Sequence, residues 1–194
     1  SGSLLEGKIS IIQKHEVQIE ISKILKEEKE NTNQLSIAIC LTKNPARLEW
    51  FIEKATEIGI SNIYPMVSER TEKEKIKQER LQQIVISAAK QSGQLFFPIL
   101  HSIQKFSELI NSTNNQYNQY FIAHCENQKQ HLKNLYQKKE SALLLIGPEG
   151  DFTPTEIQQA INKNYTPISL GNSILRVETA GVVACSIVSI INAE

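Results

Sequence analysis

Two stretches near the C-terminal end of the sequence combine glycines with charged residues. The first is GPEG at residues 147–150, directly after the apolar run 143–146. A turn between a strand and a helix needs no acidic residue, and the glycines leave the backbone open to close approach by a ligand. Glu149 would repel a phosphate and suits a ligand that carries positive or hydrogen-bond-donating groups. The loop by itself is equally compatible with an ordinary structural turn.

The residues after GPEG need no ligand to explain them. In FTPTEI, residues 152–157, Thr153 is placed as an N-cap, Pro154 as the first helical residue and Glu156 as the capping-box partner. Phe152 and Ile157 have the spacing of a hydrophobic staple. The phosphate-binding patterns GxxxxGK[ST] and GxGxxG and the nucleophile elbow GxSxG do not occur.

The second stretch is SLGNSILRVETA, residues 169–180, which again places a glycine after an apolar run and before a helix. Arg176 and Glu178 stand at the start of that helix, where a solvated first turn is the simpler explanation, because an i, i+2 spacing makes no helical ion pair. Thr179 is compatible with a plain helix residue. Two glycine loops after successive strands would meet at one edge of a parallel sheet, which favours a single shared site.

The elements that must position these loops alternate along the chain. Residues 7–25 alternate apolar and polar side chains and predict a β-hairpin, and residues 26–34 read as a charged linker. Strands are expected at residues 35–41, 63–67, 98–100, 120–124, 142–146 and 167–170, and helices at 44–59, around 81–89, and at 106–110, 129–137, 155–163 and 177–191. This alternation predicts an α/β fold with a parallel sheet flanked by helices.

The last predicted helix is apolar around most of its circumference. Ala180, Ala184 and Val188 lie on one stripe, and Val182, Cys185 and Ile190 lie off it. Such a helix is buried on more than one side, although a sheet covers only one. An intrachain neighbour or a second subunit would cover the other side, and we favour a subunit interface.

Composition narrows the class of protein. The 194 residues suit one ordinary domain, or one domain with a small appendage. The 21 basic and 21 acidic residues give no net charge, so the composition does not indicate a protein that coats a polyanion. The three cysteines form no CxxC pair, which favours the reducing cytoplasm. No histidine spacing suggests a metal site, and no apolar run is long enough to cross a bilayer.

GPEGDFTPTEI together with SLGNSILRVETA resembles the 16S ribosomal RNA uracil N3-methyltransferases of the SPOUT superfamily. The family pattern K-x-x-E-x-G-x(5)-P-x(4)-R is matched by Lys54, Glu57, Gly59, Pro65 and Arg70, and AAKQSG at residues 88–93 is similar to its next segment. The resemblance covers about residues 35–192 without large gaps. Two departures stand out, Asp151 where the family has glycine and Gln94 where it usually has arginine.

The resemblance implies a C-terminal deep trefoil knot that binds S-adenosylmethionine, a homodimer, and methylation of N3 of a uridine in the small ribosomal subunit. Residues 35–194 would form the SPOUT domain, and the hairpin at 4–25 would be a remnant of the family's PUA-like RNA-binding barrel, joined by a linker at 26–34. The alternatives are a SPOUT-like protein that binds cofactor or RNA without activity, and a methyltransferase of another RNA.

The resemblance also assigns residues to roles. Arg176 would stabilise negative charge on the uracil or grip a phosphate, Glu178 would be a base or orient Arg176, and Lys54 and Arg70 would contact RNA. Gly147→Val is expected to abolish cofactor binding with the fold largely intact. The residues expected at the cofactor are Ala123, His124, Ile146, Gly147, Pro148, Glu149, Gly150, Leu170, Gly171, Ile174, Leu175, Arg176 and Thr179.

Overall fold

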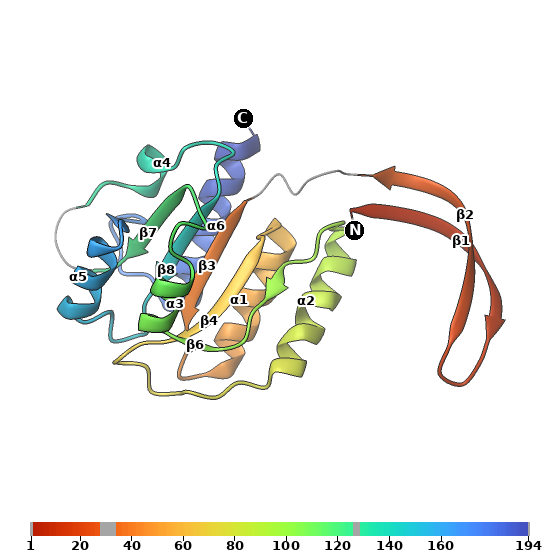
Figure 1. Cartoon of the computed structure of the whole chain (residues 1–194), viewed down its shortest axis with the longest axis horizontal. Coiled ribbons are helices and arrows are strands. Elements are labelled where there is room, and N and C mark those ends of the chain that lie inside the picture. The colour runs from red at the N-terminus through yellow and green to blue at the C-terminus, as the bar shows by residue number, and fades with distance from the viewer. Residues whose placement is uncertain (1, 28–33, 126–128, 194) are drawn as a thin grey trace. The chain divides into compact units, whose positions relative to one another are not determined.

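The structure is a computed structural model that describes residues 2–27, 34–125 and 129–193. The chain divides into two compact units, residues 1–31 and residues 32–194 (Figure 1). The first unit is a β-hairpin and the second is an α/β domain.

The hairpin pairs β1 (Ser3–Ile12) with β2 (Val17–Glu27) in antiparallel fashion. It is longer than the predicted 4–25, and Lys26 and Glu27, which we assigned to the linker, belong to β2. The strict alternation stops after Ser22, but Lys26 and Glu27 still pair with Leu4 and Ser3 of β1, so the charged side chains there did not mark the end of the strand. Residues 28–33 of the predicted linker lie outside the described residues.

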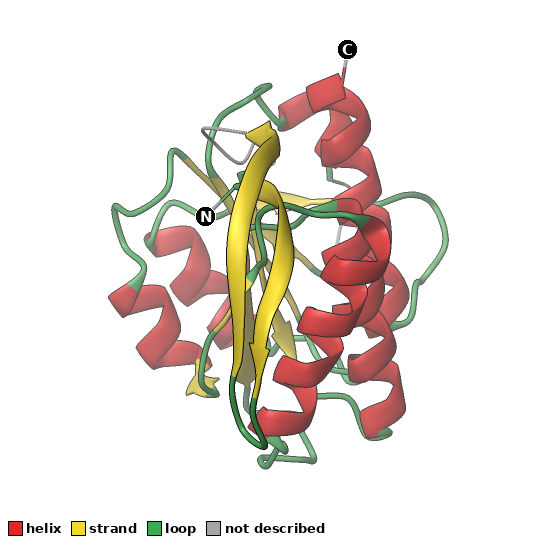
Figure 2. Cartoon of the chain, turned by 90° about the vertical axis from the view of Figure 1, so that its right-hand side faces the viewer, coloured by secondary structure: helices red, strands yellow, loops and turns green. Residues whose placement is uncertain are grey.

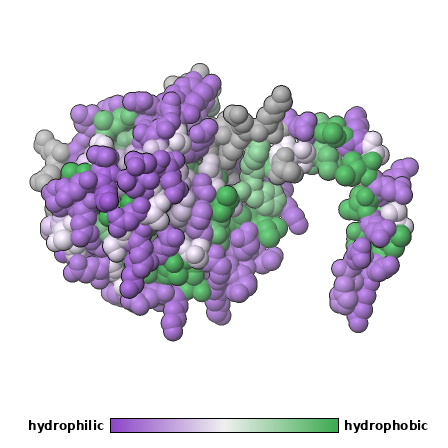
Figure 3. Space-filling view, in the orientation of Figure 1, coloured by the Kyte–Doolittle hydropathy of each residue, from purple (hydrophilic) through white to green (hydrophobic). Residues whose placement is uncertain are grey.

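One face of the hairpin is apolar and the other is charged. Ile9 lies opposite Ile19 on the apolar face, whereas Lys8 lies opposite Glu20 on the other face. The side chains of Ile9 and Ile19 are 61% and 59% exposed. Apolar residues are accordingly visible at the surface of this unit (Figure 3). A two-stranded sheet of this kind buries too little apolar surface to be stable by itself.

The α/β domain is built on one sheet in which every described pairing is parallel. The strand order is β5-β4-β3-β8-β7-β9, and β6 also pairs with β4. The strands are β3 (Leu35–Cys40), β4 (Asn62–Val67), β5 (Ile99–Leu100), β6 (Gln104–Lys105), β7 (Gln119–Ala123), β8 (Ala142–Ile146) and β9 (Thr166–Ile168). The central strand β8 therefore pairs with β3, which precedes it by about 100 residues.

Helices cover both faces of this sheet (Figure 2). They are α1 (Pro45–Ile58), α2 (Gln78–Ser92), α3 (Phe106–Ser112), α4 (Leu132–Leu135), α5 (Pro154–Asn162) and α6 (Val177–Ala193). The side chains of α1, α2, α4 and α6 share one hydrophobic cluster, and those of α3 and α5 share the other. Within β3, Ile37 faces the first cluster and Ala38 the second, as the period-two geometry of a strand requires.

The helix boundaries follow the predicted caps where local sequence sets them. The Asn44 side chain accepts a hydrogen bond from the Ala46 N–H at 3.1 Å, and Gly59 ends α1 with φ of 101°. The prediction was wrong at the short elements. The helix expected at 129–137 is only Leu132–Leu135, α3 extends to Ser112 beyond the expected 106–110, and β6 was not predicted.

Helix α6 is covered on its second side within the chain. It packs against α1 and α4 as well as against β3 and β8. Cys185, which lies off the predicted stripe, is fully buried in the cluster shared with α1. The apolar circumference that favoured a subunit interface is thus explained largely by α1, although the off-stripe Ile190 remains 62% exposed.

Candidate functional site

A cavity of about 880 Å³ lies at the carboxyl ends of β7, β8 and β9. This is the edge of a parallel sheet at which ligands usually bind. The two glycine loops form most of its walls, so the structure brings together the two loops that we expected to share one site. The lining residues are Arg47, Ala123, His124, Cys125, Lys129, Ile146, Gly147, Pro148, Glu149, Asp151, Ile168, Ser169, Leu170, Gly171, Asn172, Ser173, Ile174, Leu175, Arg176, Val177 and Ala180.

Most of the predicted cofactor residues line this cavity, but Gly150 and Thr179 do not. The Gly150 carbonyl accepts a hydrogen bond at 2.8 Å from Nη1 of Arg70, and the Arg70 stem lies beside the glycine, 3.5 Å from where a Cβ atom would stand. Arg70, a predicted RNA contact, therefore supports the GPEG loop. This contact joins residues 80 positions apart in the sequence, which no local pattern reveals.

The acidic residue of GPEG has a tertiary partner. Oε1 of Glu149 accepts a hydrogen bond from the Lys43 N–H at 3.0 Å and lies 3.9 Å from Nη1 of Arg47. The carboxylate thereby fastens the loop to the start of α1. The turn itself needs no acidic residue, as we inferred from the sequence. The role of Glu149 comes instead from the segment between β3 and α1, to which its carboxylate is bonded.

Gly147 also has a packing role. A Cβ atom at this position would lie 3.0 Å from the Phe152 ring and 3.2 Å from the Phe152 nitrogen. Phe152 is buried, so it has little room to move away. Gly147→Val would consequently disturb the start of α5 as well as the cavity, contrary to the expectation that the fold stays largely intact.

The second loop presents exposed apolar and charged side chains to the cavity. Gly171 has φ of 139°, a conformation that side chains strongly disfavour, and the Ser169 hydroxyl donates to its carbonyl at 2.9 Å. Ile174 is 87% exposed although it lines the cavity. Arg176 is exposed at the start of α6. An isoleucine left this uncovered is suited to contact an apolar part of a ligand.

Glu178 lies beneath this surface, paired with an arginine that the sequence did not single out. The residue is buried, and its Oε1 lies 3.7 Å from Nε of Arg47. Among the described residues, Oε2 of Glu178 has no hydrogen-bond partner. The interaction partner in the structure is therefore Arg47 and not Arg176. Arg47 lies in the first turn of α1, and the sequence around it indicated only the start of a helix.

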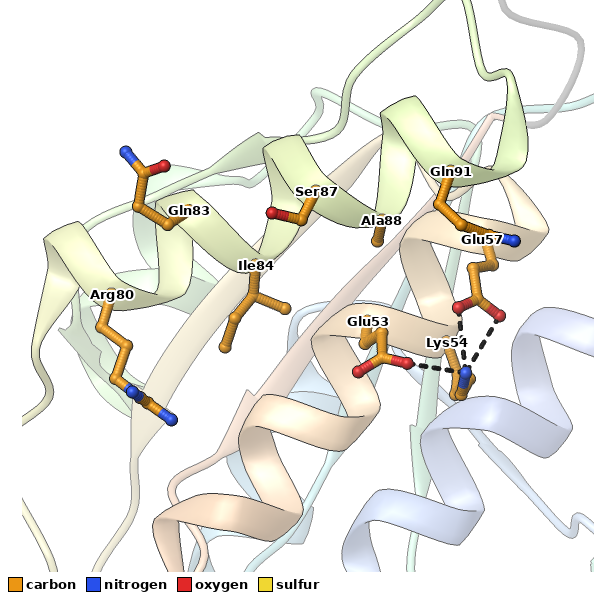
Figure 4. A pocket seen from close by; sticks show the side chains of 9 residues that line it. All are labelled: Glu53, Lys54, Glu57, Arg80, Gln83, Ile84, Ser87, Ala88 and Gln91. Carbon is orange, nitrogen blue, oxygen red and sulfur yellow. Dashed lines mark hydrogen bonds and ion pairs between the residues drawn. The ribbon is translucent and has the colours of Figure 1, made fainter.

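Lys54 lies in a separate groove of about 610 Å³ between α1 and α2 (Figure 4). Its Nζ atom is 2.7 Å from Glu53 Oε1 and 2.9 Å from Glu57 Oε1. Lys54 and Glu57 lie one turn apart on α1, so their contact is an ordinary surface ion pair, and it reduces the positive charge available to a phosphate. The groove shares no lining residue with the cavity.

The departure at Gln94 has a structural explanation. The Gln94 side chain donates from Nε2 to the Glu57 carbonyl at 2.9 Å and lies against Gly59. It therefore satisfies one of the carbonyls left open at the end of α1.

No group of three or more His, Cys, Asp or Glu side chains in the described ranges could hold a metal ion. None of the described helices is long and apolar enough to cross a membrane.

The three cysteines differ sharply in expected reactivity. Burial raises the pKa of the Cys40 and Cys185 thiols to about 12, and both side chains are inaccessible, whereas Cys125 is exposed on the cavity wall. Since the thiolate is the reactive form, an alkylating reagent at pH 8 should modify Cys125 alone in the folded protein. Mass spectrometry should find one label before unfolding and three after it. Early modification of Cys40 or Cys185 would contradict this packing.

Comparison with known proteins was made on the whole chain. The RNA methyltransferase domain family matches residues 28–189. Ribosomal RNA small subunit methyltransferase E of Mesomycoplasma hyopneumoniae is 30% identical over 84% of this chain and 72% of its own length. A probable rRNA methyltransferase from Porphyromonas gingivalis superposes with a TM-score of 0.89 at 34% identity, covering 99% of this chain and 82% of that one.

A further solved relative carries a ligand. It is the ribosomal RNA small subunit methyltransferase E of Neisseria gonorrhoeae bound to S-adenosylmethionine, with a TM-score of 0.78 and 27% identity over 95% of this chain and 77% of that chain. The parallel sheet, the cavity at its carboxyl edge and these matches together define the class of protein. The chain belongs to the RNA methyltransferase domain family. The family prediction made from the two loop motifs is thereby confirmed.

Proposed function

We propose that this protein transfers a methyl group from S-adenosylmethionine to N3 of a uridine in 16S ribosomal RNA of the small subunit. The observation that carries the proposal is one cavity lined by residues 147–149 of GPEG and by residues 169–176, two segments about 20 residues apart that lie at the ends of β8 and β9. Relatives named as ribosomal RNA small subunit methyltransferases support the substrate class. The uridine N3 specificity rests on the resemblance of the two motifs.

The residues present suit S-adenosylmethionine. The cavity has the size of typical small-molecule sites. Leu170, Ile174 and Leu175 offer apolar surface, and the backbone beside Gly147 and Gly171 offers hydrogen-bonding groups. When bound there, the cofactor supplies an electrophilic methyl group on a sulfonium, so the protein has to position the base and manage one proton.

Arg176 is the proposed residue on the substrate side. The N3–H of uracil must lose its proton, and the nitrogen then gains the methyl group, so negative charge develops on the base. The exposed guanidinium of Arg176 at the cavity would stabilise that charge and ease release of the proton to water. The base must be unpaired for its Watson–Crick edge to reach the site.

Glu178 is assigned an orienting role. It does not line the cavity, and its carboxylate lies beside Arg47, which does. We infer that Glu178 holds the Arg47 guanidinium in place and does not remove the uracil proton directly. Arg70 would still be able to approach RNA with its remaining donors, whereas the paired Lys54 is the weaker candidate.

We further propose a cytoplasmic homodimer whose interface includes the exposed side chain of Ile190 on α6. The cytoplasmic location rests on the small-subunit RNA substrate. Sedimentation velocity would test the dimer, and a monomer at micromolar concentration would contradict it.

The hairpin is proposed to be the end of a PUA-like RNA-binding barrel, because its apolar face is uncovered in the described residues. Loss of RNA affinity on charge reversal of Lys8 and Lys23 would support this role.

A C-terminal deep trefoil knot is proposed from the motif resemblance. The insertion of β8 between β3 and β7, and the packing of α6 against α1 and α4, are compatible with such threading. Mechanical unfolding from the two termini distinguishes the topologies. A knotted chain reaches a contour length shorter than that of the full sequence, whereas an unknotted chain reaches the full length.

The decisive experiment is tritiated methyl transfer to small subunits from a strain that lacks this activity. We expect label in 16S ribosomal RNA and, after digestion, in 3-methyluridine. Label in another nucleoside or another RNA would refute the substrate proposal. S-adenosylmethionine binding without any transfer would favour a binding protein of the same fold. Slower alkylation of Cys125 in the presence of the cofactor would locate binding at this cavity independently of activity.

A further inference from the structure

Asp151 follows the GPEG loop in a conformation that most side chains avoid. Its φ is 61°, in the left-handed region, and its N–H donates to the Pro148 carbonyl at 2.9 Å to close the turn. Glycine adopts this conformation without strain, whereas aspartate and asparagine adopt it at a modest cost. The turn itself therefore does not require a carboxylate.

The two oxygens of this carboxylate bind two separate segments. Oδ1 accepts a hydrogen bond from the adjacent Phe152 N–H at 2.8 Å, immediately before α5. Oδ2 accepts one from the Cys125 N–H at 2.7 Å, just beyond the end of β7. The first bond is local, but the second joins positions 26 residues apart across the cavity wall. Hydrogen bonds to an ionised acceptor are the stronger kind.

We propose that Asp151 is a positioning residue for the cofactor cavity, fixing the end of β7 against the GPEG loop. The cavity wall that it fixes carries Ala123, His124 and Cys125, all of which line the cavity together with Asp151 itself. This inference rests on the proposed cofactor site. It concerns one of the two residues at which the sequence departs from the family pattern.

The variant Asp151→Gly removes the carboxylate and keeps the backbone conformation. It should raise the dissociation constants of S-adenosylmethionine and S-adenosylhomocysteine by the same factor, about three- to tenfold, as the loss of one net hydrogen bond predicts. Asp151→Asn keeps an αL-tolerant residue with one accepting oxygen, and it should fall between wild type and Asp151→Gly. Calorimetry on the full chain measures both constants.

A second readout is independent of the cofactor. Burial and the neighbouring Asp151 carboxylate raise the pKa of the Cys125 thiol. Removal of that carboxylate should shift the pH profile of Cys125 alkylation toward lower pH, in Asp151→Asn as well as in Asp151→Gly. An unshifted profile in both variants would show that the carboxylate does not sit at Cys125 and would overturn the inference.

The remaining outcomes separate this inference from the proposed function. If the wild-type chain binds S-adenosylmethionine and Asp151→Gly binds it equally well, the positioning role is refuted while the cofactor site stands. A loss confined to S-adenosylmethionine, with S-adenosylhomocysteine unaffected, would mean direct recognition of the sulfonium charge and would also refute positioning. Absence of binding by the wild-type chain would overturn the cofactor site itself.

Discussion

Arg176→Ala is expected to lower the rate of methyl transfer about 10²–10³-fold, the usual effect of removing one donor that stabilises developing negative charge. The side chain is exposed at the cavity, so its loss leaves no gap in the core. The Arg176 backbone carbonyl accepts the Ala180 N–H at 2.8 Å, and alanine preserves this bond. The fold and the start of α6 should therefore remain intact.

Single-turnover methyl transfer at saturating cofactor measures this effect. Arg176→Lys serves as the matched variant, because it keeps the charge but loses the planar pair of donors, and it should be intermediate in rate. The dissociation constant of S-adenosylmethionine should change little in either variant. A loss of cofactor affinity as large as the loss of rate would place Arg176 in cofactor binding and not on the substrate side.

Gly181→Ala should produce the largest loss of stability among conservative substitutions in α6. A Cβ atom at this position would lie 2.4 Å and 2.5 Å from two carbons of the Phe51 ring, which is itself fully buried. Alanine normally stabilises a helix by up to about 1 kcal/mol relative to glycine. Overpacking costs about 1–3 kcal/mol or more, which exceeds the gain in helix propensity. The free energy of unfolding of the variant should therefore be lower than that of the wild type.

Urea unfolding of the full chain, followed by circular dichroism, measures the change. Ser189→Ala, at a half-exposed position of the same helix, is the matched control and should change the free energy of unfolding by less than about 0.5 kcal/mol. Phe51→Leu should relieve part of the clash, so the double variant should be more stable than the sum of the two single effects predicts. Additive effects would show that Gly181 and Phe51 do not contact each other.

The sequence identified the site's two main walls because each is a short segment with strong local signals. The Thr153–Glu156 capping box and the apolar run before Gly147 are set by neighbours within a few residues. The same is true of the caps Asn44 and Gly59. Patterns of this kind have a fixed period or spacing, so they can be recognised in the sequence without knowledge of the fold.

The contacts that the sequence did not reveal join residues far apart in the chain. Arg47 approaches Glu149 and Glu178 from α1, more than 100 residues away in the chain. Arg70 supports Gly150 from the loop that follows β4. None of these contacts produces a repeating pattern in the sequence. Each forms only because the folded sheet brings two distant segments together. The short elements were misjudged for a related reason, since two-residue strands such as β6 carry no alternation to detect.

The sequence by itself thus determined the α/β class, the helix caps and the two loops that belong to one methyltransferase family, because local propensity and motif spacing suffice for these features. The tertiary structure decided why the loops have their composition. Glu149 and Arg70 hold GPEG in place, Phe152 explains the glycine at 147, and Arg47 partners Glu178. Ion pairs and close packing depend on distances of a few ångströms, which only the folded chain sets.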